Sequence, residues 1–180
     1  MKRFVALIAI IFSINMNAQR ILTDENSLDN TRTIVTTEEE FYDDETVGMT
    51  YYIGKNNKDT LRVINITIEE WGKMEEGRSF LLKFKDGSIL ELKNIKNQTA
   101  HPVAGHWGMG PVMCLQPAFI VTEDQLNKIC EGEVVKLRFE QGDDIVDKKI
   151  KKNKFSTLIR NCRKVLNEAG SQQRDLRKDF

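Results

Sequence analysis

The stretch SFLLKFKDGSILELK, residues 79–93, decides the fold. Apolar residues recur at every second position on both sides of a central turn; they are Phe80, Leu82, Phe84, Leu90 and Leu92. Alternation of this kind is typical of strands that bury one face, and Asp86-Gly87 between the two halves is a turn signal. The stretch therefore predicts a β-hairpin.

The length of the turn sets which residues of this hairpin face each other. A two-residue loop would place Leu82 opposite the charged Glu91. A three-residue loop over residues 85–87, with Gly87 in the left-handed conformation, places Leu82 opposite Leu90 instead. We predict the second register, because it puts the apolar side chains of both strands on one face.

Further strands are predicted from β-rich or alternating runs on both sides of the hairpin, at residues 41–42, 49–53, 61–71, 112–121, 135–139 and 145–150. In residues 61–71 the apolar phase slips from odd to even positions, which either a bulge or burial of both faces would explain. A short helix is predicted to begin after Thr122, because Thr122 and Gln125 form a capping-box pattern, and to stop at Gly132.

The most regular pattern lies near the C-terminus. Apolar residues recur there at helical spacing, at Phe155, Leu158, Ile159, Cys162, Val165, Leu166 and Ala169. They form one stripe, as expected of an amphipathic helix laid across a sheet, and Gly170 is its predicted end. Together these elements predict an α+β fold: an antiparallel β-sheet, either a sandwich or an open barrel, with a short helix and a C-terminal amphipathic helix packed on it.

Residues 1–18 have the composition of a secretory signal peptide. Lys2 and Arg3 are positively charged, residues 4–14 are apolar, and a small residue, Ala18, precedes the expected cleavage point. We therefore expect an exported protein, periplasmic or extracellular. The apolar run is shorter than the roughly 20 residues that span a bilayer, and no later segment approaches that length. No transmembrane segment is expected in the mature chain.

The rest of the chain is expected to form one domain. Residues 19–40 are polar without a sustained period and predict an extended or partly disordered segment. Residues 41–170 carry the strands and helices of a single α+β domain, and residues 171–180 are expected to be a polar tail.

The charge is balanced overall but uneven along the chain. The formal net charge is zero, while residues 19–60 carry an excess of six acidic residues and residues 145–180 an excess of seven basic ones. Two solvated faces are the simpler interpretation, and a basic surface for an acidic glycan or lipid headgroup is the alternative. Aromatic residues do not interleave the lysines, so no nucleic-acid partner is expected.

Three cysteines would reach an oxidising compartment if the chain is exported. They allow at most one intramolecular disulfide bond. Cys162 falls on the apolar stripe of the last helix, where a buried thiol is ordinary, so the expected pair is Cys114 with Cys130.

Both histidines lie in the glycine-rich stretch NQTAHPVAGHWGMGP, residues 97–111. His101 and His106 could bind a metal or supply a general base, and Trp107 could stack on a sugar or a peptide. A zinc site needs a third protein ligand, which this stretch lacks, and the acidic residues 38–45 lack the order of a calcium loop. No metal or cofactor is expected, and the main interpretation is a long loop between strands, with Trp107 folded back on the core.

Three segments resemble small exported proteins of unknown function from Bacteroidetes-type bacteria: FLLKFKDGSILEL at residues 80–92, FIVTEDQL at 119–126 and VKLRFE at 135–140. The resemblance implies export and a β-rich fold, and it implies no functional residue. We expect a non-enzymatic module that binds a partner protein or glycan through loops. The alternatives are a small periplasmic hydrolase that uses His101 and His106, and a surface assembly or adhesin subunit with an exposed strand edge.

Overall fold

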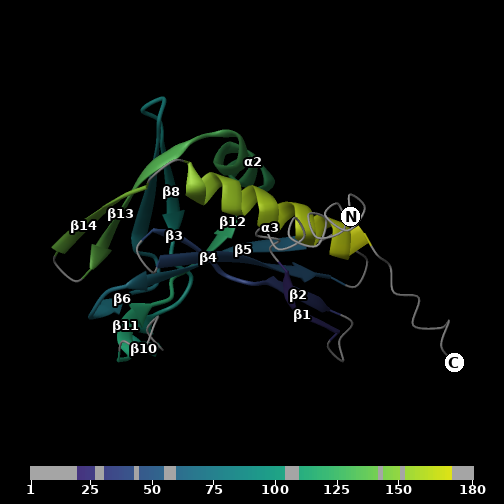
Figure 1. The fold of residues 1–180 in the computed structure, drawn as a ribbon, viewed down its shortest axis with the longest axis horizontal. Helices are drawn as coiled ribbons and strands as arrows, with labels where there is room; N and C mark the ends of the chain where they lie inside the picture. Colours follow the sequence, from purple (N-terminus) through teal and green to yellow (C-terminus); the bar gives the residue numbers. More distant parts are fainter. Residues whose placement is uncertain are drawn as a thin grey trace, which may run out of the picture.

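The eight-stranded antiparallel sheet is curled into a half-barrel (Figure 1). The computed structural model describes residues 20–26, 31–42, 45–54, 60–103, 110–141, 144–150 and 153–171. The sheet contains β1 (Ile21–Asn26), β2 (Arg32–Thr36), β3 (Glu39–Tyr42), β4 (Glu45–Ile53), β5 (Thr60–Glu69), β10 (His101–Val103), β11 (Val112–Leu115) and β12 (Ala118–Val121). Its order is β1-β2-β4-β5-β11-β10, with β3 paired to β4 and β12 paired to β5.

A second antiparallel sheet has four strands in the order β14-β13-β7-β8. It consists of β7 (Ser79–Phe84), β8 (Ile89–Lys93), β13 (Val134–Gln141) and β14 (Asp144–Lys149). A short pair, β6 (Lys73–Met74) with β9 (Gln98–Thr99), and an isolated bridge between Asn94 and Phe119 lie where the chain passes between the two large sheets.

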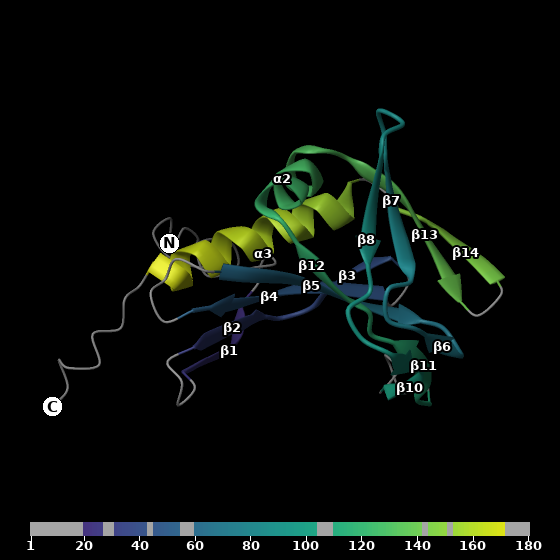
Figure 2. The same ribbon diagram turned by 180° about the vertical axis from the view of Figure 1, so that it is seen from behind.

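Two helices cover the concave side of the half-barrel. The long helix α3 (Lys154–Ser171) runs across β4 and β5, and the short helix α2 (Glu123–Glu131) lies beside it (Figures 1 and 2). Contacts of α3 reach β2, β3 and β4 as well as α2. Among the described residues, no helix combines the length and the apolar character needed to cross a membrane.

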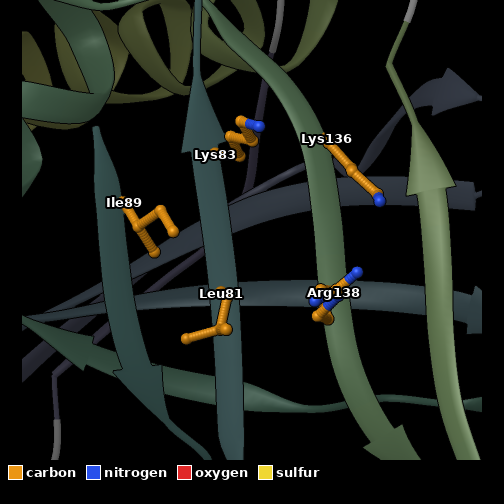
Figure 3. Close-up of a pocket in the computed structure, with 5 residues that line it drawn as sticks. All are labelled: Leu81, Lys83, Ile89, Lys136 and Arg138. Carbon is orange, nitrogen blue, oxygen red and sulfur yellow. The ribbon is translucent and has the colours of Figure 1, made fainter. Parts of the chain in front are cut away.

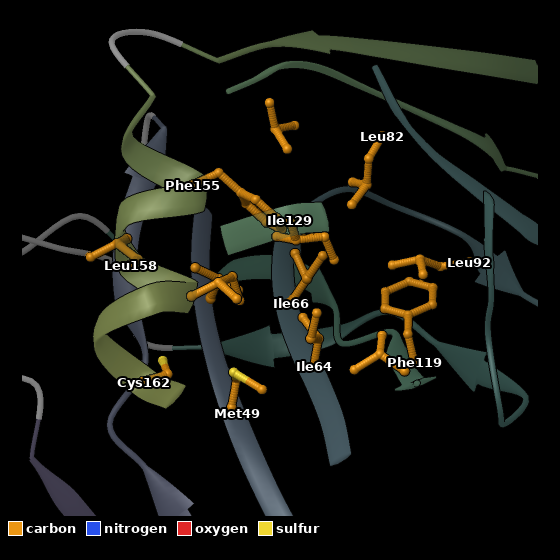
Figure 4. Close-up of a cluster of buried hydrophobic side chains, with 14 of the residues drawn as sticks. Met49, Ile64, Ile66, Leu82, Leu92, Phe119, Ile129, Phe155, Leu158 and Cys162 are labelled. Carbon is orange, nitrogen blue, oxygen red and sulfur yellow. The ribbon is translucent and has the colours of Figure 1, made fainter. Parts of the chain in front are cut away.

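One apolar core fills the space between the sheets and the helices (Figure 4). The ring of Phe80 on β7 stacks on that of Phe139, with centroids 5.4 Å apart, and meets that of Phe119 on β12 at 4.8 Å. On the helix side, Phe155 packs edge-on against Phe41 at 5.2 Å. These aromatic contacts tie the four-stranded sheet and α3 to the half-barrel.

The structure confirms the predicted fold class and the hairpin register. Leu82 lies opposite Leu90, and Gly87 has a φ of 88°, the left-handed conformation expected of a three-residue loop. The slip in residues 61–71 comes from burial of both faces, since β5 pairs with β4 without a register shift and Val63 is buried on the face opposite Ile64.

The capping box of the short helix is also confirmed, with Thr122 accepting from the backbone N–H of Gln125 while the Gln125 side chain accepts from that of Thr122. The long helix continues through Gly170 to Ser171, one residue beyond the predicted end. A Cβ atom at Gly170 would lie 3.4 Å from the Ile53 side chain, an ordinary van der Waals contact, so packing does not require a glycine at this position.

The N-terminal part of the fold differs from the prediction. We expected residues 19–40 to be an extended or partly disordered segment outside the domain, but β1 and β2 belong to the half-barrel. Ile34 of β2 is fully buried, and the Thr36 hydroxyl accepts a hydrogen bond from the backbone N–H of Met49. A few buried side chains and the pairing of β2 with β4 are sufficient to place a mostly polar segment in the sheet.

Candidate functional site

A basic and partly apolar groove lies on the outer face of the four-stranded sheet (Figure 3). It is a hollow of about 140 Å³ lined by Leu81 and Lys83 of β7, Ile89 of β8, and Lys136 and Arg138 of β13. Alternation along each strand explains this lining. Leu82 and Leu137 point into the core, so their neighbours in sequence point outward.

Three lysines cross the outer face in one row. Lys83 of β7 lies opposite Lys136 of β13, and Lys136 lies opposite Lys149 of β14. Directly opposite residues share a face, with Cβ atoms about 4.5–5.5 Å apart, and like charges in such positions destabilise a sheet. We call Lys83, Lys136 and Lys149 the lysine row. The row concentrates positive charge at an energetic cost to the fold.

Asp147 of β14 offsets part of this charge. Its two carboxylate oxygens accept from Arg138 Nε at 2.7 Å and from Lys136 Nζ at 2.6 Å. The hydrogen bonds from Arg138 and Lys136 hold the pKa of the Asp147 carboxyl well below its usual range. One carboxylate balances only one of the four positive charges on this part of the sheet, so the groove remains cationic.

The neighbouring charges on the same face are already used in contacts with one another. Lys93 lies 2.5 Å from Glu91, and Arg78 lies 2.8 Å from Glu140. The positive excess is therefore confined to the lysine row and Arg138.

The groove also offers apolar surface. Leu81 lies opposite Arg138 of β13 on one side and Glu91 of β8 on the other. Ile89, opposite Lys83 in the hairpin, is 57% exposed. A hollow of this size is smaller than the roughly 300–1,000 Å³ of pockets for drug-sized ligands. It suits one acidic side chain or head group together with an adjoining aliphatic group.

The residues that the sequence indicated as site candidates lie away from this groove. His101 is exposed on β10, in the other sheet. His106 and Trp107 lie outside the described residues. The structure therefore does not bring His101 into the groove.

The strand pairing brings other reactive groups to His101. His101 lies opposite Cys114 of β11, and Cys114 lies opposite Glu69 of β5, so the three share one face of the half-barrel. This arrangement could not be predicted from local patterns, because Glu69 and Cys114 are far apart along the chain. Cys114 is only 4% exposed.

The disulfide bond expected between Cys114 and Cys130 is not formed, and Cys114, Cys130 and Cys162 are all buried thiols. Cys114 lies on β11 and Cys130 on α2, elements that occupy opposite ends of the molecule in both views (Figures 1 and 2). A disulfide bond requires Cα atoms about 4.4–6.8 Å apart, which this separation does not allow. Burial raises the pKa of the Cys130 thiol and raises that of Cys162 to about 12.

Within the part of the chain that the structure describes, no group of three or more His, Cys, Asp or Glu residues is arranged to hold a metal ion. No known protein family, curated protein or solved structure matches the chain.

Proposed function

We propose that the protein is an exported, non-enzymatic binding module that holds an acidic segment of a partner protein in the groove of the four-stranded sheet. The observation that carries the proposal is the lysine row beside Leu81 and Ile89. Three lysines face one another across three strands at a cost to stability, and an acidic partner would remove that cost.

A peptide fits the groove better than a glycan does. Sugar rings bind well against aromatic side chains, and none of the five residues that line the hollow is aromatic. The mixture of basic and aliphatic side chains instead matches a peptide in which acidic and aliphatic residues lie next to each other. Its acidic side chains would pair with Lys83 and Lys136, and its aliphatic ones would contact Leu81 and Ile89.

Binding can be measured by fluorescence anisotropy with a labelled synthetic peptide that contains Glu-Leu pairs. The test variant replaces the lysine row by glutamine (Lys83→Gln, Lys136→Gln, Lys149→Gln). The control variant replaces three exposed lysines elsewhere (Lys73→Gln, Lys96→Gln, Lys164→Gln), so both have the same net charge. The test variant should lose affinity by roughly tenfold or more, and the control should bind like the wild type.

Two results would contradict the proposal. Equal losses in both triple variants would mean that only net charge matters. An acidic polysaccharide that binds more tightly than the peptide, and whose binding depends on the lysine row, would make the ligand a glycan.

Export has its own test. The expectation rests on the signal-peptide composition of residues 1–18. In a bacterial host, the protein should be recovered from the periplasm or medium with Gln19 as its first residue, as checked by intact mass. Recovery from the cytosol with Met1 or Lys2 still present would contradict export.

A thiol-dependent hydrolase is the second candidate, and the observation that favours it is the position of His101 opposite Cys114. In that reading His101 would remove the proton from the Cys114 thiol. The low exposure of Cys114 counts against it. Hydrolysis of a panel of ester and peptide substrates that disappears in Cys114→Ala and in His101→Ala would favour the hydrolase over the binding module.

A further inference from the structure

The edge strand β1 of the half-barrel turns a leucine toward solvent. The register of β1 against β2 slips between Ile21 and Thr23, so Leu22 is the extra residue of a β-bulge. Ile21 packs against the core, whereas Leu22 is 67% exposed. Full burial of a leucine side chain is worth roughly 1.5–3 kcal/mol, and the single molecule gains little of this at Leu22. A partner that covers Leu22 would gain it.

The same strand is acidic. Glu25 is exposed on β1, and β1 contains no basic residue. Residues 19–60, which include β1, carry the acidic excess of the chain. An exposed aliphatic and an exposed acidic side chain on one segment are the two features that the groove fits. The chain itself therefore contains a segment with the chemistry of the ligand.

The spacing of the side chains agrees on the two surfaces. Leu22 and Glu25 are three residues apart on a strand, a distance of about 10 Å at roughly 3.3 Å per residue. Ile89 lies opposite Lys83, and Lys83 lies opposite Lys136. Ile89 and Lys136 are thus separated by two strand spacings, roughly 9.6 Å in total. A strand laid across β8, β7 and β13 can place Leu22 on Ile89 and Glu25 at Lys136.

The β1 strand of one molecule does not reach the groove of the same molecule. β1 and the four-stranded sheet lie on opposite sides of the molecule in both views (Figures 1 and 2). Among the described strands, β1 pairs with β2 alone, so its other edge faces away from the sheet. A contact between β1 and a groove therefore joins two copies of the chain.

Two other apolar side chains are as exposed as Leu22 but fit the groove less well. Trp71 is 70% exposed and Ile145 is 67% exposed. Lys73 follows Trp71 two positions later, and Lys148 and Lys149 share β14 with Ile145. Like charges brought together across an interface are unfavourable, so the lysine row would repel both segments. β1 brings no positive charge to the groove.

We propose that the groove binds β1 of a second copy of this chain, with Glu25 accepting from Lys83 and Lys136 and with Leu22 in contact with Ile89. The inference rests on the proposed function, for which it names the partner. The two surfaces in this contact belong to different parts of the chain. Each pair of copies therefore leaves one groove and one β1 exposed, and the assembly is a head-to-tail one that can grow.

Sedimentation velocity over a series of protein concentrations tests the inference. The groove variant is the triple glutamine variant of the lysine row. The β1 variant is Leu22→Ser with Glu25→Lys. Its matched control is Leu61→Ser with Glu131→Lys, which changes the same residue types at exposed positions on β5 and α2. Circular dichroism melts check that each variant is folded.

The average mass of the wild type and of the control should rise with concentration beyond that of a dimer, and added salt should lower it. The groove variant and the β1 variant should each remain monomeric. An equimolar mixture of these two variants should form a 1:1 dimer that does not grow, because the pair contains one intact groove and one intact β1. The β1 variant should bind the Glu-Leu peptide like the wild type, since its groove is unchanged.

Three results would overturn the inference. One is a groove variant that still associates while the β1 variant does not, which would mean that β1 edges pair with each other. Another is a mixture of the two variants that stays monomeric. The third is a wild type that is monomeric at every concentration. If that monomer still binds the Glu-Leu peptide in the groove, the proposed function stands with a different partner, and if it does not, both proposals fail.

Discussion

Lys148 of β14 lies 2.9 Å from Glu45 at the start of β4, so a cation of the four-stranded sheet meets a carboxylate of the half-barrel. Glu45 is 1% exposed, and Lys148 is also 2.9 Å from Glu70, just after β5. The three charges connect the outermost strand of the smaller sheet to the larger one. The groove depends on this connection, because β14 carries both Asp147 and Lys149.

Replacement of Lys148 by methionine should destabilise the fold by about 3 kcal/mol, because it removes the positive charge that lies 2.9 Å from the buried Glu45 carboxylate. Lys149→Met, at the exposed neighbouring position, should change stability by less than about 0.5 kcal/mol. Urea denaturation monitored by circular dichroism measures both. Equal and small effects would show that Lys148 contributes no more than a surface lysine.

The contacts of Lys148 with Glu45 and Glu70 should make the stability of the fold depend on pH in the alkaline range. Burial lowers the pKa of Lys148, but the hydrogen bonds to Glu45 and Glu70 outweigh it, and the net shift is upward. A raised folded-state pKa contributes stability that is present below the unfolded value of about 10.4 and is lost as the pH rises through the folded-state value. Wild-type stability should therefore fall more steeply than that of Lys148→Met above pH 10.

Asp147→Asn should strengthen binding in the groove. The wild-type carboxylate competes with an acidic ligand for Lys136 and Arg138, and the amide removes that competition. Affinity for the Glu-Leu peptide should rise in the anisotropy assay, whereas Asp124→Asn, at an exposed acid on α2, should leave it unchanged. A fall in affinity would mean that Asp147 positions the two cations rather than competing for them.

The contribution of Asp147 to stability should depend on pH in the acid range. Its pKa is lowered in the folded protein by Arg138 and Lys136, so its contribution to stability is present above the unfolded value of about 3.9 and is lost as the pH falls toward the folded-state value. Thermal melts between pH 5 and 2 should show a shallower decline for Asp147→Asn than for the wild type. Identical slopes would contradict this linkage.

Patterns that are local in sequence predicted the hairpin, the two helices and the α+β class correctly. Each of these predictions depends on residues that are close together in the sequence. They are the turn of the hairpin, the capping box that begins at Thr122, and the apolar stripe along α3. The groove could not be predicted in this way. Lys83 and Lys136 are more than fifty residues apart, and only the pairing of β7 with β13 brings them together.

The two wrong predictions, on residues 19–40 and on the disulfide bond, also arose because sequence patterns do not show which strands pair. Residues 19–40 look too polar for a sheet, yet β2 is held by its pairing with β4 and by contact with α3. The pairing of Cys114 with Cys130 was inferred by elimination, which ignores where β11 and α2 lie. Once the strand order is known, alternation along β7, β13 and β14 is sufficient to identify the outward-facing lysines.

Gly87 allows a direct test of the hairpin turn. Its φ of 88° is unfavourable for residues with a side chain, and no atom lies within 4 Å of the position that a Cβ would occupy. The cost of Gly87→Ala is therefore conformational, about 1 kcal/mol, and Gly87→Asn should cost less because asparagine tolerates the left-handed region. Chemical denaturation of both variants measures the difference. Equal costs would indicate a steric rather than a conformational origin.

The three thiols should stay reduced when the folded protein is held under oxidising conditions. Cys162 is fully buried, and burial raises the pKa of its thiol to about 12, so it is protonated at pH 8 and attacks a disulfide very slowly. Cys114 and Cys130 lie on elements too far apart to pair. Iodoacetamide added to the native protein at pH 8 should therefore leave Cys162 unlabelled, and iodoacetamide added after unfolding without reductant should label all three cysteines, as read by mass spectrometry. A protein that takes up only one label after unfolding would contain a disulfide bond, which would contradict this prediction. Peptide mapping would then show which two cysteines are joined, for example Cys130 of α2 and Cys162 of the neighbouring helix α3.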